Sequence, residues 1–269
     1  MPALIPVALY LLSFALLSHS LNATDPAHRQ RLQLAAGLFA LGSTLAHIAA
    51  LFDFGVNARA LDLHFFAALS LVGLGIALLC ALLSLARPAM AALGLIVYPV
   101  AAGCHLVYAL RGETAASAST LSWQIHLHAW LALLAYATLS LAALVAIMLW
   151  LQERALRRRQ FATVLRAFPP LTLIEALLFQ LIAAGFALLT LALLSGAVFV
   201  DNLFAQHLVH KTVLSLLAWA AFGALLFGRM RYGWRGRRAV RLTLTAMALL
   251  GFAFFGSKFV LELVLMRTA

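Results

Sequence analysis

Eight apolar stretches, each about 20 residues long and separated by short polar loops, dominate this chain. About 20 apolar residues are what an α-helix needs to cross the hydrocarbon core of a bilayer. The stretches are unbroken rather than alternating, which favours helices over barrel strands. The expected spans are roughly 3–21, 33–52, 63–85, 90–110, 124–151, 172–198, 207–228 and 239–265. The predicted fold is therefore an all-α polytopic transmembrane helix bundle, forming a single integral membrane domain over residues 1–269.

The charged residues are too few for a water-soluble domain of this length. They make up 10% of the chain, against about a quarter in ordinary soluble domains. The formal net charge of +11 does not indicate nucleic acid, because the arginines lie in short loops between apolar spans, where they act as topology signals. The sequence thus predicts the lipid bilayer as a partner and excludes nucleic acid.

The basic residues are divided unequally between the two sides of the predicted bundle. Loops after the first, third, fifth and seventh spans hold 14 of the 19 Lys and Arg residues. By the positive-inside rule these arginine-rich loops are cytoplasmic, so both termini are outside. The expected location is a bacterial inner membrane, with a multi-pass chain.

Histidines gather on the side opposite to these arginines. Seven of the nine lie at or near the outer ends of the expected spans: His47, His64, His105, His126, His128, His207 and His210. Ionisable side chains within a membrane are costly and tend to mark function. Imidazoles collected at one depth favour a metal or haem site, in which two imidazoles ligate a b-type haem. Arg111 and Lys211 are placed to meet the haem propionates.

Not every histidine in such an array needs to bind anything. An imidazole at a helix end can sit half-hydrated among lipid headgroups, and this alternative applies to each of the seven. It applies least to His47 and His128, because both are flanked by apolar residues. These two are the predicted axial metal ligands, His210 is the reserve ligand, and His105 is a further candidate for cofactor binding.

The second half of the chain resembles the cytochrome c assembly family of membrane proteins, which includes the CcsA, ResC and HemX types, and it looks nearest to the YpjD type. The likeness covers roughly 120–265. The stretches that carry it are His128–Tyr136, Leu151–Arg154, Pro169–Glu175, Gly185–Val198, His210–Trp219, Trp234–Arg238 and Gly256–Phe259. The resemblance implies a haem-associated role, with His128 matching the histidine that opens the equivalent helix in CcsA-like members.

The chain also departs from that family pattern. The place before the span at 207–228, where CcsA-like members carry a tryptophan-rich haem-handling segment, is here only Phe199–Gln206, without tryptophan. We therefore expect a protein that binds or handles haem b near the outer membrane face and is not an enzyme on its own. The alternative is a partner or scaffold subunit of a transporter or assembly complex, without a cofactor.

Overall fold

The computed structural model describes residues 4–53, 64–111, 122–157, 169–199, 209–256 and 259. Eight long helices account for nearly all of them: α1 (Ile5–Ser20), α2 (Pro26–Asp53), α3 (Phe65–Ala86), α4 (Gly94–Arg111), α5 (Trp123–Arg157), α7 (Leu171–Phe199), α8 (Val209–Tyr232) and α9 (Arg237–Gly251). Seven helical stretches are long and apolar enough to cross a membrane, and α1 is a shorter apolar helix of 16 residues. No strand occurs in these ranges, so the predicted all-α membrane bundle is confirmed.

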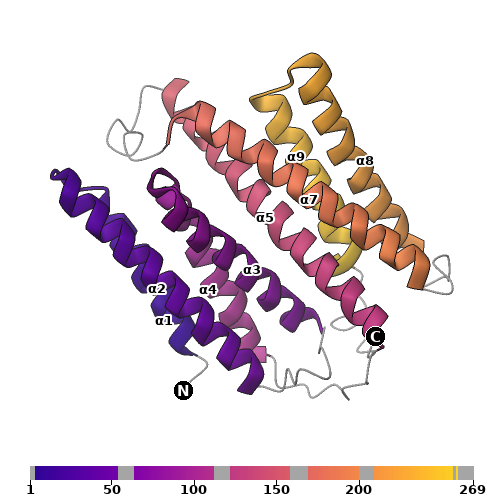
Figure 1. Cartoon of the computed structure of the whole chain (residues 1–269), viewed down its shortest axis with the longest axis horizontal. Helices are drawn as coiled ribbons and strands as arrows, with labels where there is room; N and C mark the ends of the chain where they lie inside the picture. The colour runs from indigo at the N-terminus through magenta and orange to yellow at the C-terminus, as the bar shows by residue number, and fades with distance from the viewer. Residues whose placement is uncertain are drawn as a thin grey trace.

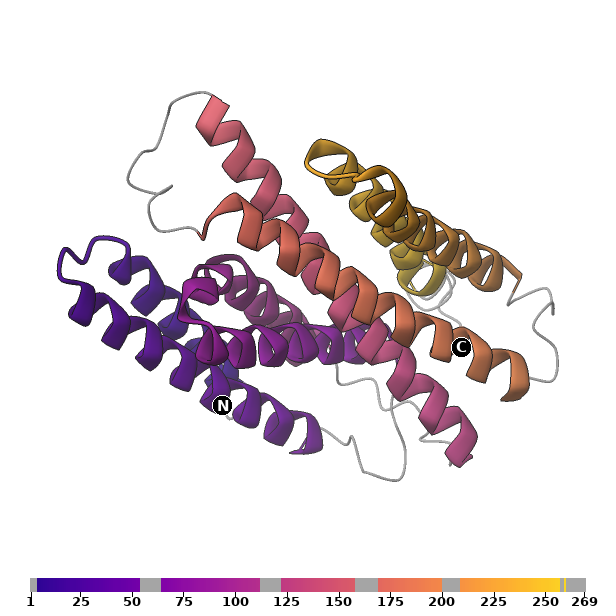
Figure 2. The ribbon, with the colours of Figure 1, turned by 45° about the horizontal axis from the view of Figure 1, so that its top comes forward.

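The helices form two groups that meet along α3 and α5 (Figures 1 and 2). In the first group α1 packs against α2 and α4, and α3 packs against α2 and α4. In the second group α5 packs against α7 and α9, and α8 packs against α9 and α7. The family-like half, expected over 120–265, therefore begins at the helix that joins the two groups.

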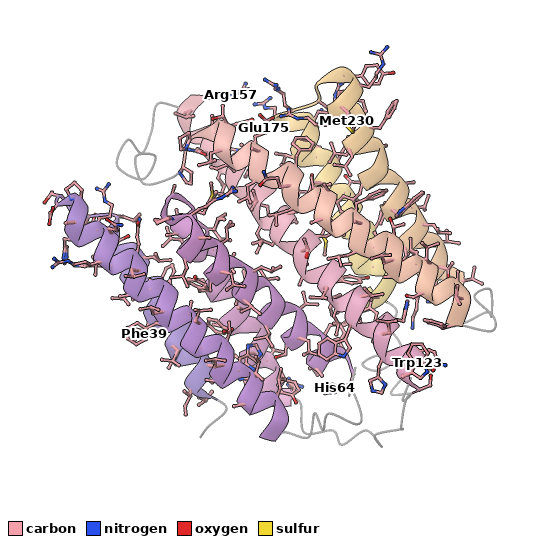
Figure 3. All side chains as sticks on the ribbon, viewed as in Figure 1. Phe39, His64, Trp123, Arg157, Glu175 and Met230 are labelled. Atoms are coloured by element: carbon pink, nitrogen blue, oxygen red, sulfur yellow. The ribbon has the colours of Figure 1, made fainter. Side chains whose placement is uncertain are left out.

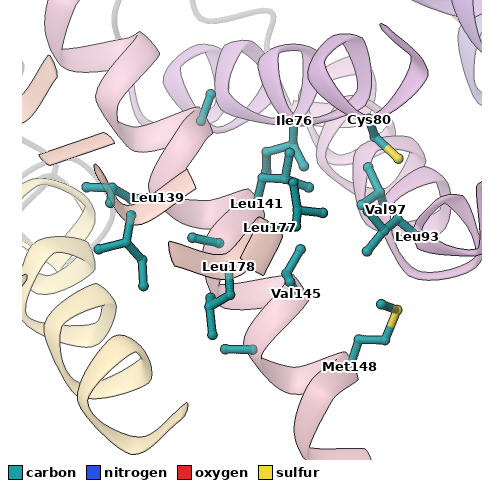
Figure 4. Close-up of a cluster of buried hydrophobic side chains, with 14 of the residues drawn as sticks. Ile76, Cys80, Leu93, Val97, Leu139, Leu141, Val145, Met148, Leu177 and Leu178 are labelled. Carbon is teal, nitrogen blue, oxygen red and sulfur yellow. The ribbon is translucent and has the colours of Figure 1, made fainter. Parts of the chain in front are cut away.

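Small residues let α5 come close to its neighbours. A Cβ added at Gly75 of α3 would lie 2.6 Å from the Cβ of Ala137, and one added at Gly185 of α7 would lie 2.5 Å from Leu139. Helices in a bilayer gain stability from such close contact, because lipid is as apolar as their side chains and burial alone drives little association. The buried apolar side chains around Leu141 and Leu177 fill the space between α3, α4, α5 and α7 (Figure 4).

Two features of the sequence set helix boundaries. Pro170 precedes α7, and its carbonyl accepts the amides of Leu173 and Ile174, as expected for a proline at a helix start. At the other end of the chain, α9 passes into a π-helical turn at Phe252–Gly256. The hydroxyl of Tyr136 donates to the Leu250 carbonyl at 2.5 Å, so a side chain enters the backbone ladder where the helix widens.

The two ends of the bundle differ in chemistry, as Figure 3 shows. His64 and Trp123 lie at one end, which we call the histidine end, and Arg157, Glu175 and Met230 lie at the opposite end, which we call the arginine end. His64 and Arg157 thus lie at opposite ends of the bundle, which agrees with the predicted separation of the histidines from the arginine-rich loops. The side of the membrane that each end faces remains a prediction.

Candidate functional site

The histidines of the histidine end fall into two sets, one in each helix group. The first group contains His47 on α2, His64 just before α3, and His105 on α4. The second group contains His126 and His128 on α5, and His210 on α8. His207, also predicted to belong to the array, lies outside the described residues. Each set has its own surroundings and is described separately.

His47 and His105 form a buried polar cluster with Ser70 and Tyr10. Both imidazoles are fully buried, and their ring centroids lie 4.0 Å apart. His47 Nε2 lies 2.8 Å from Ser70 Oγ, and Ser70 Oγ lies 3.4 Å from His105 Nδ1. On the other side of the ring, His47 Nδ1 lies 3.3 Å from the Tyr10 hydroxyl. Four helices, α1 to α4, thus each supply one polar side chain to a single point in an apolar core.

Both ring nitrogens of His47 are therefore already used in hydrogen bonds. Burying a polar group without a hydrogen-bond partner in an apolar medium costs several kcal/mol. The hydrogen bonds to Tyr10 and Ser70 avoid this cost for the His47 ring. Ligation of a metal by His47 would require one of these bonds to break. The cluster holds two imidazoles, and nowhere in the described ranges do three or more His, Cys, Asp or Glu side chains form a group that could hold a metal ion.

His128 has the opposite arrangement, with one nitrogen fixed and one available. Its Nδ1 lies 3.0 Å from the carbonyl oxygen of Ala192 and 3.0 Å from Ser195 Oγ, both on α7. The Ser195 hydroxyl donates to the same carbonyl at 2.9 Å. A carbonyl can only accept, so these partners assign the proton to Nδ1. Nε2 is then the unprotonated nitrogen, and within the described part of the chain nothing makes a hydrogen bond to it.

The position of the His128 ring depends on a glycine. The ring packs on Gly196, where an added Cβ would lie 3.1 Å from His128 Cε1, closer than ordinary contact. The side chain is half-buried between α5 and α7. An imidazole with Nδ1–H donated to a backbone carbonyl and Nε2 open is the usual arrangement of a metal-ligating histidine and its supporting partner.

The other predicted site residues lie at the same end, one on α4 and two on α8. Arg111 is exposed at the last residue of α4, His210 is exposed in the first turn of α8, and Lys211 beside it is half-buried. The structure brings His47 together with His105 and gives His128 its contacts on α7. It shows no contact between the described side chains of His47 and His128.

Sequence reasoning missed the residues that orient these histidines. Ser70 is a hydroxyl in an apolar span, and Tyr10 is a phenol in another, so their burial cost inside a membrane was the available signal. Ser195 and Gly196 carried no such signal, since small residues are common in membrane helices and their role depends on which helix packs against them.

The arginine end is held together by Glu175, in the first turns of α7. Its Oε1 accepts the backbone N–H of Gly236 at 3.1 Å and lies 3.7 Å from Arg229 Nη1. Glu175 thereby joins the start of α7 to the turn between α8 and α9. Trp234 is half-buried, because its ring packs directly on Gly228, where a Cβ would overlap it.

The family described as cytochrome C assembly protein matches residues 33–265. The chain belongs to the cytochrome c assembly protein family. This match includes the first helix group from residue 33 onwards, and so extends beyond the stretch 120–265 that carries the resemblance in the sequence.

Several relatives agree with this membership. The chain is 39% identical over 137 residues to "Inner membrane protein YpjD" of Escherichia coli strain K12, which covers 51% of this chain and 52% of that protein. It is 36% identical over 143 residues to an uncharacterised 28.8 kDa protein of Azospirillum brasilense, covering 52% and 53%.

A more distant relative is "Cytochrome c biogenesis protein CcsA" of Gloeobacter violaceus, which is 29% identical over 110 residues, covering 40% of this chain and 30% of that protein. The chain thus spans about half the length, or less, of the curated relatives that it matches. No solved structure matches this member of the cytochrome c assembly family.

Proposed function

We propose that this chain is a haem-associated protein of a bacterial inner membrane, which binds or handles haem b at its histidine end and does not catalyse a reaction on its own. Family membership supports the association with haem, and the name of the Escherichia coli relative supports the inner membrane. The orientation proposed from the arginine-rich loops makes the histidine end the outer end.

The observation that carries the proposal is the anchoring of the His128 ring to the neighbouring helix α7, which fixes both its tautomer and its position. Its fixed Nδ1–H and open Nε2 suit an axial ligand of haem iron, and the Ala192 carbonyl would raise the basicity of the ligating nitrogen. When bound, haem supplies iron redox chemistry, while this chain's own contribution is to hold and orient the ring that meets it. Because both nitrogens of His47 are engaged, His47 does not fit a ligand in this arrangement.

The second ligand is therefore proposed from the reserve candidate at the same end. His210 is exposed in the first turn of α8. Lys211 and Arg111 supply positive charge at that end, suited to the haem propionates. His47 remains a ligand only if its bond to Tyr10 or to Ser70 opens, and His105 only if its contact with Ser70 does.

The proposal is tested by titrating haem into detergent-purified protein and following the Soret band. His126→Ala is the matched control for His128→Ala. His126 lies two residues away on the same helix and also directs Nδ1 at a backbone carbonyl, but that carbonyl belongs to Ser122 in its own turn, at 3.0 Å, so the pair isolates the contact of His128 with α7. We expect His128→Ala to lose tight binding and His126→Ala to keep it. Equal titration curves for the two variants would remove His128 from the site.

One observation favours the alternative of a cofactor-free partner or scaffold subunit. The buried His47–Ser70–His105 cluster shows that at least part of the histidine array is satisfied within the protein itself. Purification from native membranes distinguishes the two functions. A stoichiometric second protein with no pigment favours the scaffold, and a coloured protein favours haem binding.

A further inference from the structure

A basic pocket opens at the arginine end, between the last turns of α5 and the first turn of α9. It has a volume of about 220 Å³ and is lined by Trp150, Glu153, Arg154, Arg157 and Arg237. This volume is roughly seven times the share of one water molecule in the liquid, about 30 Å³, so it has room for a phosphate-bearing headgroup. Neither the histidine site nor the family match assigns any role to it.

The charges around the pocket favour an anion with two negative charges. Among the described residues, three guanidinium groups and one carboxylate, that of Glu153, line it, which leaves about two positive charges. Guanidinium groups bind phosphate oxygens through pairs of parallel hydrogen bonds. Such a site therefore binds phosphate more strongly than it binds a simple monovalent anion. A headgroup with two singly charged phosphodiesters would match this balance, whereas one phosphodiester would leave positive charge unmatched.

The pocket is partly ordered before any ligand arrives, at the Arg154 side chain and in the backbone that leads to Arg237. Arg154 stacks over the Trp150 ring, with its Cζ 5.4 Å from the ring centroid. Arg237 follows a tight turn with glycines at positive φ, Gly233 at 66° and Gly236 at 57°. That turn is tied to α7 through the Glu175 oxygen that accepts the Gly236 amide. Such preorganisation lowers the entropy that binding must offset.

The location of the pocket indicates lipid as the source of the phosphate. Trp150 is 41% exposed, and Leu151 and Leu156, on the same turns of α5, are 47% and 48% exposed. An exposed tryptophan beside leucines at the end of a membrane helix marks the headgroup level, with acyl chains alongside. We propose that this pocket binds the headgroup of an anionic phospholipid, with the two-phosphate headgroup of diphosphatidylglycerol preferred over single-phosphate headgroups.

Native mass spectrometry of the full chain in detergent tests this inference, with diphosphatidylglycerol, phosphatidylglycerol or phosphatidylcholine added in turn. We expect the order of affinity to follow that list. At about 1 kcal/mol for each arginine near the surface, or fivefold, the Arg157→Ala/Arg237→Ala variant should bind diphosphatidylglycerol about 30-fold more weakly. The variant Glu153→Gln should bind it more tightly, because it removes the opposing charge.

The matched control is Arg231→Ala/Arg235→Ala, which removes the same charge from exposed arginines at the same end that do not line the pocket. Its affinity should stay within about twofold of the parent chain. Equal losses in the two double variants, or no preference for diphosphatidylglycerol over phosphatidylcholine, would overturn the proposal. Inorganic phosphate added at millimolar concentration should not displace the lipid, and displacement would indicate a soluble-anion site instead. None of these outcomes depends on haem.

Discussion

At the scale of single residues, the difference between His47 and His128 lies in what their two nitrogens face. His47 is enclosed by Tyr10 and Ser70, so its ring is a structural link between helices. His128 meets a backbone carbonyl that can only accept, and this leaves its second nitrogen as a free base. The same side chain is thereby satisfied in one place and available for ligation in the other.

The packing of His128 on Gly196 yields a prediction at this scale. Gly196→Val would push the imidazole away from Ala192, because even a Cβ there reaches 3.1 Å from the ring. We expect haem affinity to fall by about tenfold or more, as for other changes to the support of a metal ligand. Ser195→Ala is the control, since the Ala192 carbonyl still accepts Nδ1–H. Identical haem titrations for Gly196→Val and the parent chain would show that the ring's position does not matter.

The buried cluster gives a second prediction. Ser70→Ala removes the hydroxyl that His47 Nε2 faces, and we expect a loss of about 1–3 kcal/mol in unfolding free energy for the unsatisfied imidazole. Ser84→Ala, on the same helix, is the control, because the Ser84 hydroxyl donates to the Cys80 carbonyl one turn before it, and its other neighbours are the Cys80 thiol and Tyr98 rather than a histidine. Thermal unfolding in detergent would measure both, and a Ser70→Ala protein as stable as Ser84→Ala would contradict the structural role of the cluster.

At the scale of helices, α5 is the element on which the bundle depends. It packs against α7 and α9 in its own group, and it joins the first group through α3. The glycines facing it, Gly75 and Gly185, permit this because they replace side chains with direct contact between helices. Gly75, which the sequence shows only as a small residue, therefore determines how closely the two groups pack.

A pair of glycine substitutions tests this. Gly75→Ala should cost about 1–3 kcal/mol of stability, because its Cβ would be 2.6 Å from the Cβ of Ala137 and the helices must move apart. Gly42→Ala on α2, where nothing lies within 4 Å of the added Cβ, should be neutral or slightly stabilising. Thermal midpoints that fall equally in both variants would mean that the α3–α5 contact is not close.

The α8–α9 turn depends on Glu175 in the same manner. Glu175→Ala leaves the Gly236 amide without its acceptor, at a cost of about 1–3 kcal/mol, whereas Glu175→Gln keeps an oxygen for that amide and loses only the charge facing the part-exposed Arg229. Limited proteolysis of the turn should accelerate in the alanine variant and change little in the glutamine variant. Equal acceleration of proteolysis in the two variants would assign the role of Glu175 to its charge alone.

At the scale of the whole molecule, the number and limits of the helices could largely be predicted from hydropathy, because the length of a span is set by the bilayer itself. The separation of the histidines from the arginines could also be predicted, because successive spans cross the membrane in alternating directions. The partner of each histidine could not be predicted, since it depends on which helices are neighbours. His47 meets His105 because α2, α3 and α4 pack in chain order, whereas His128 lies on α5 and faces the next helix, α7.

The orientation of the bundle is a prediction for the whole molecule. In a background lacking Cys80 and Cys104, we expect Ser122→Cys at the histidine end to react with a membrane-impermeant maleimide in intact spheroplasts. Arg231→Cys at the arginine end, also exposed, should react only after lysis. The reverse pattern would place the histidine end in the cytoplasm.

The most direct test of the central claim is the absorption spectrum of the protein purified from its native membrane, oxidised and then reduced with dithionite, with a pyridine haemochrome assay. If the histidine end binds haem through His128, the spectrum has a Soret band and sharp reduced α and β bands of a b-type haem, and these are lost in His128→Ala but kept in His126→Ala. A colourless protein that also fails to take up added haem would contradict the claim.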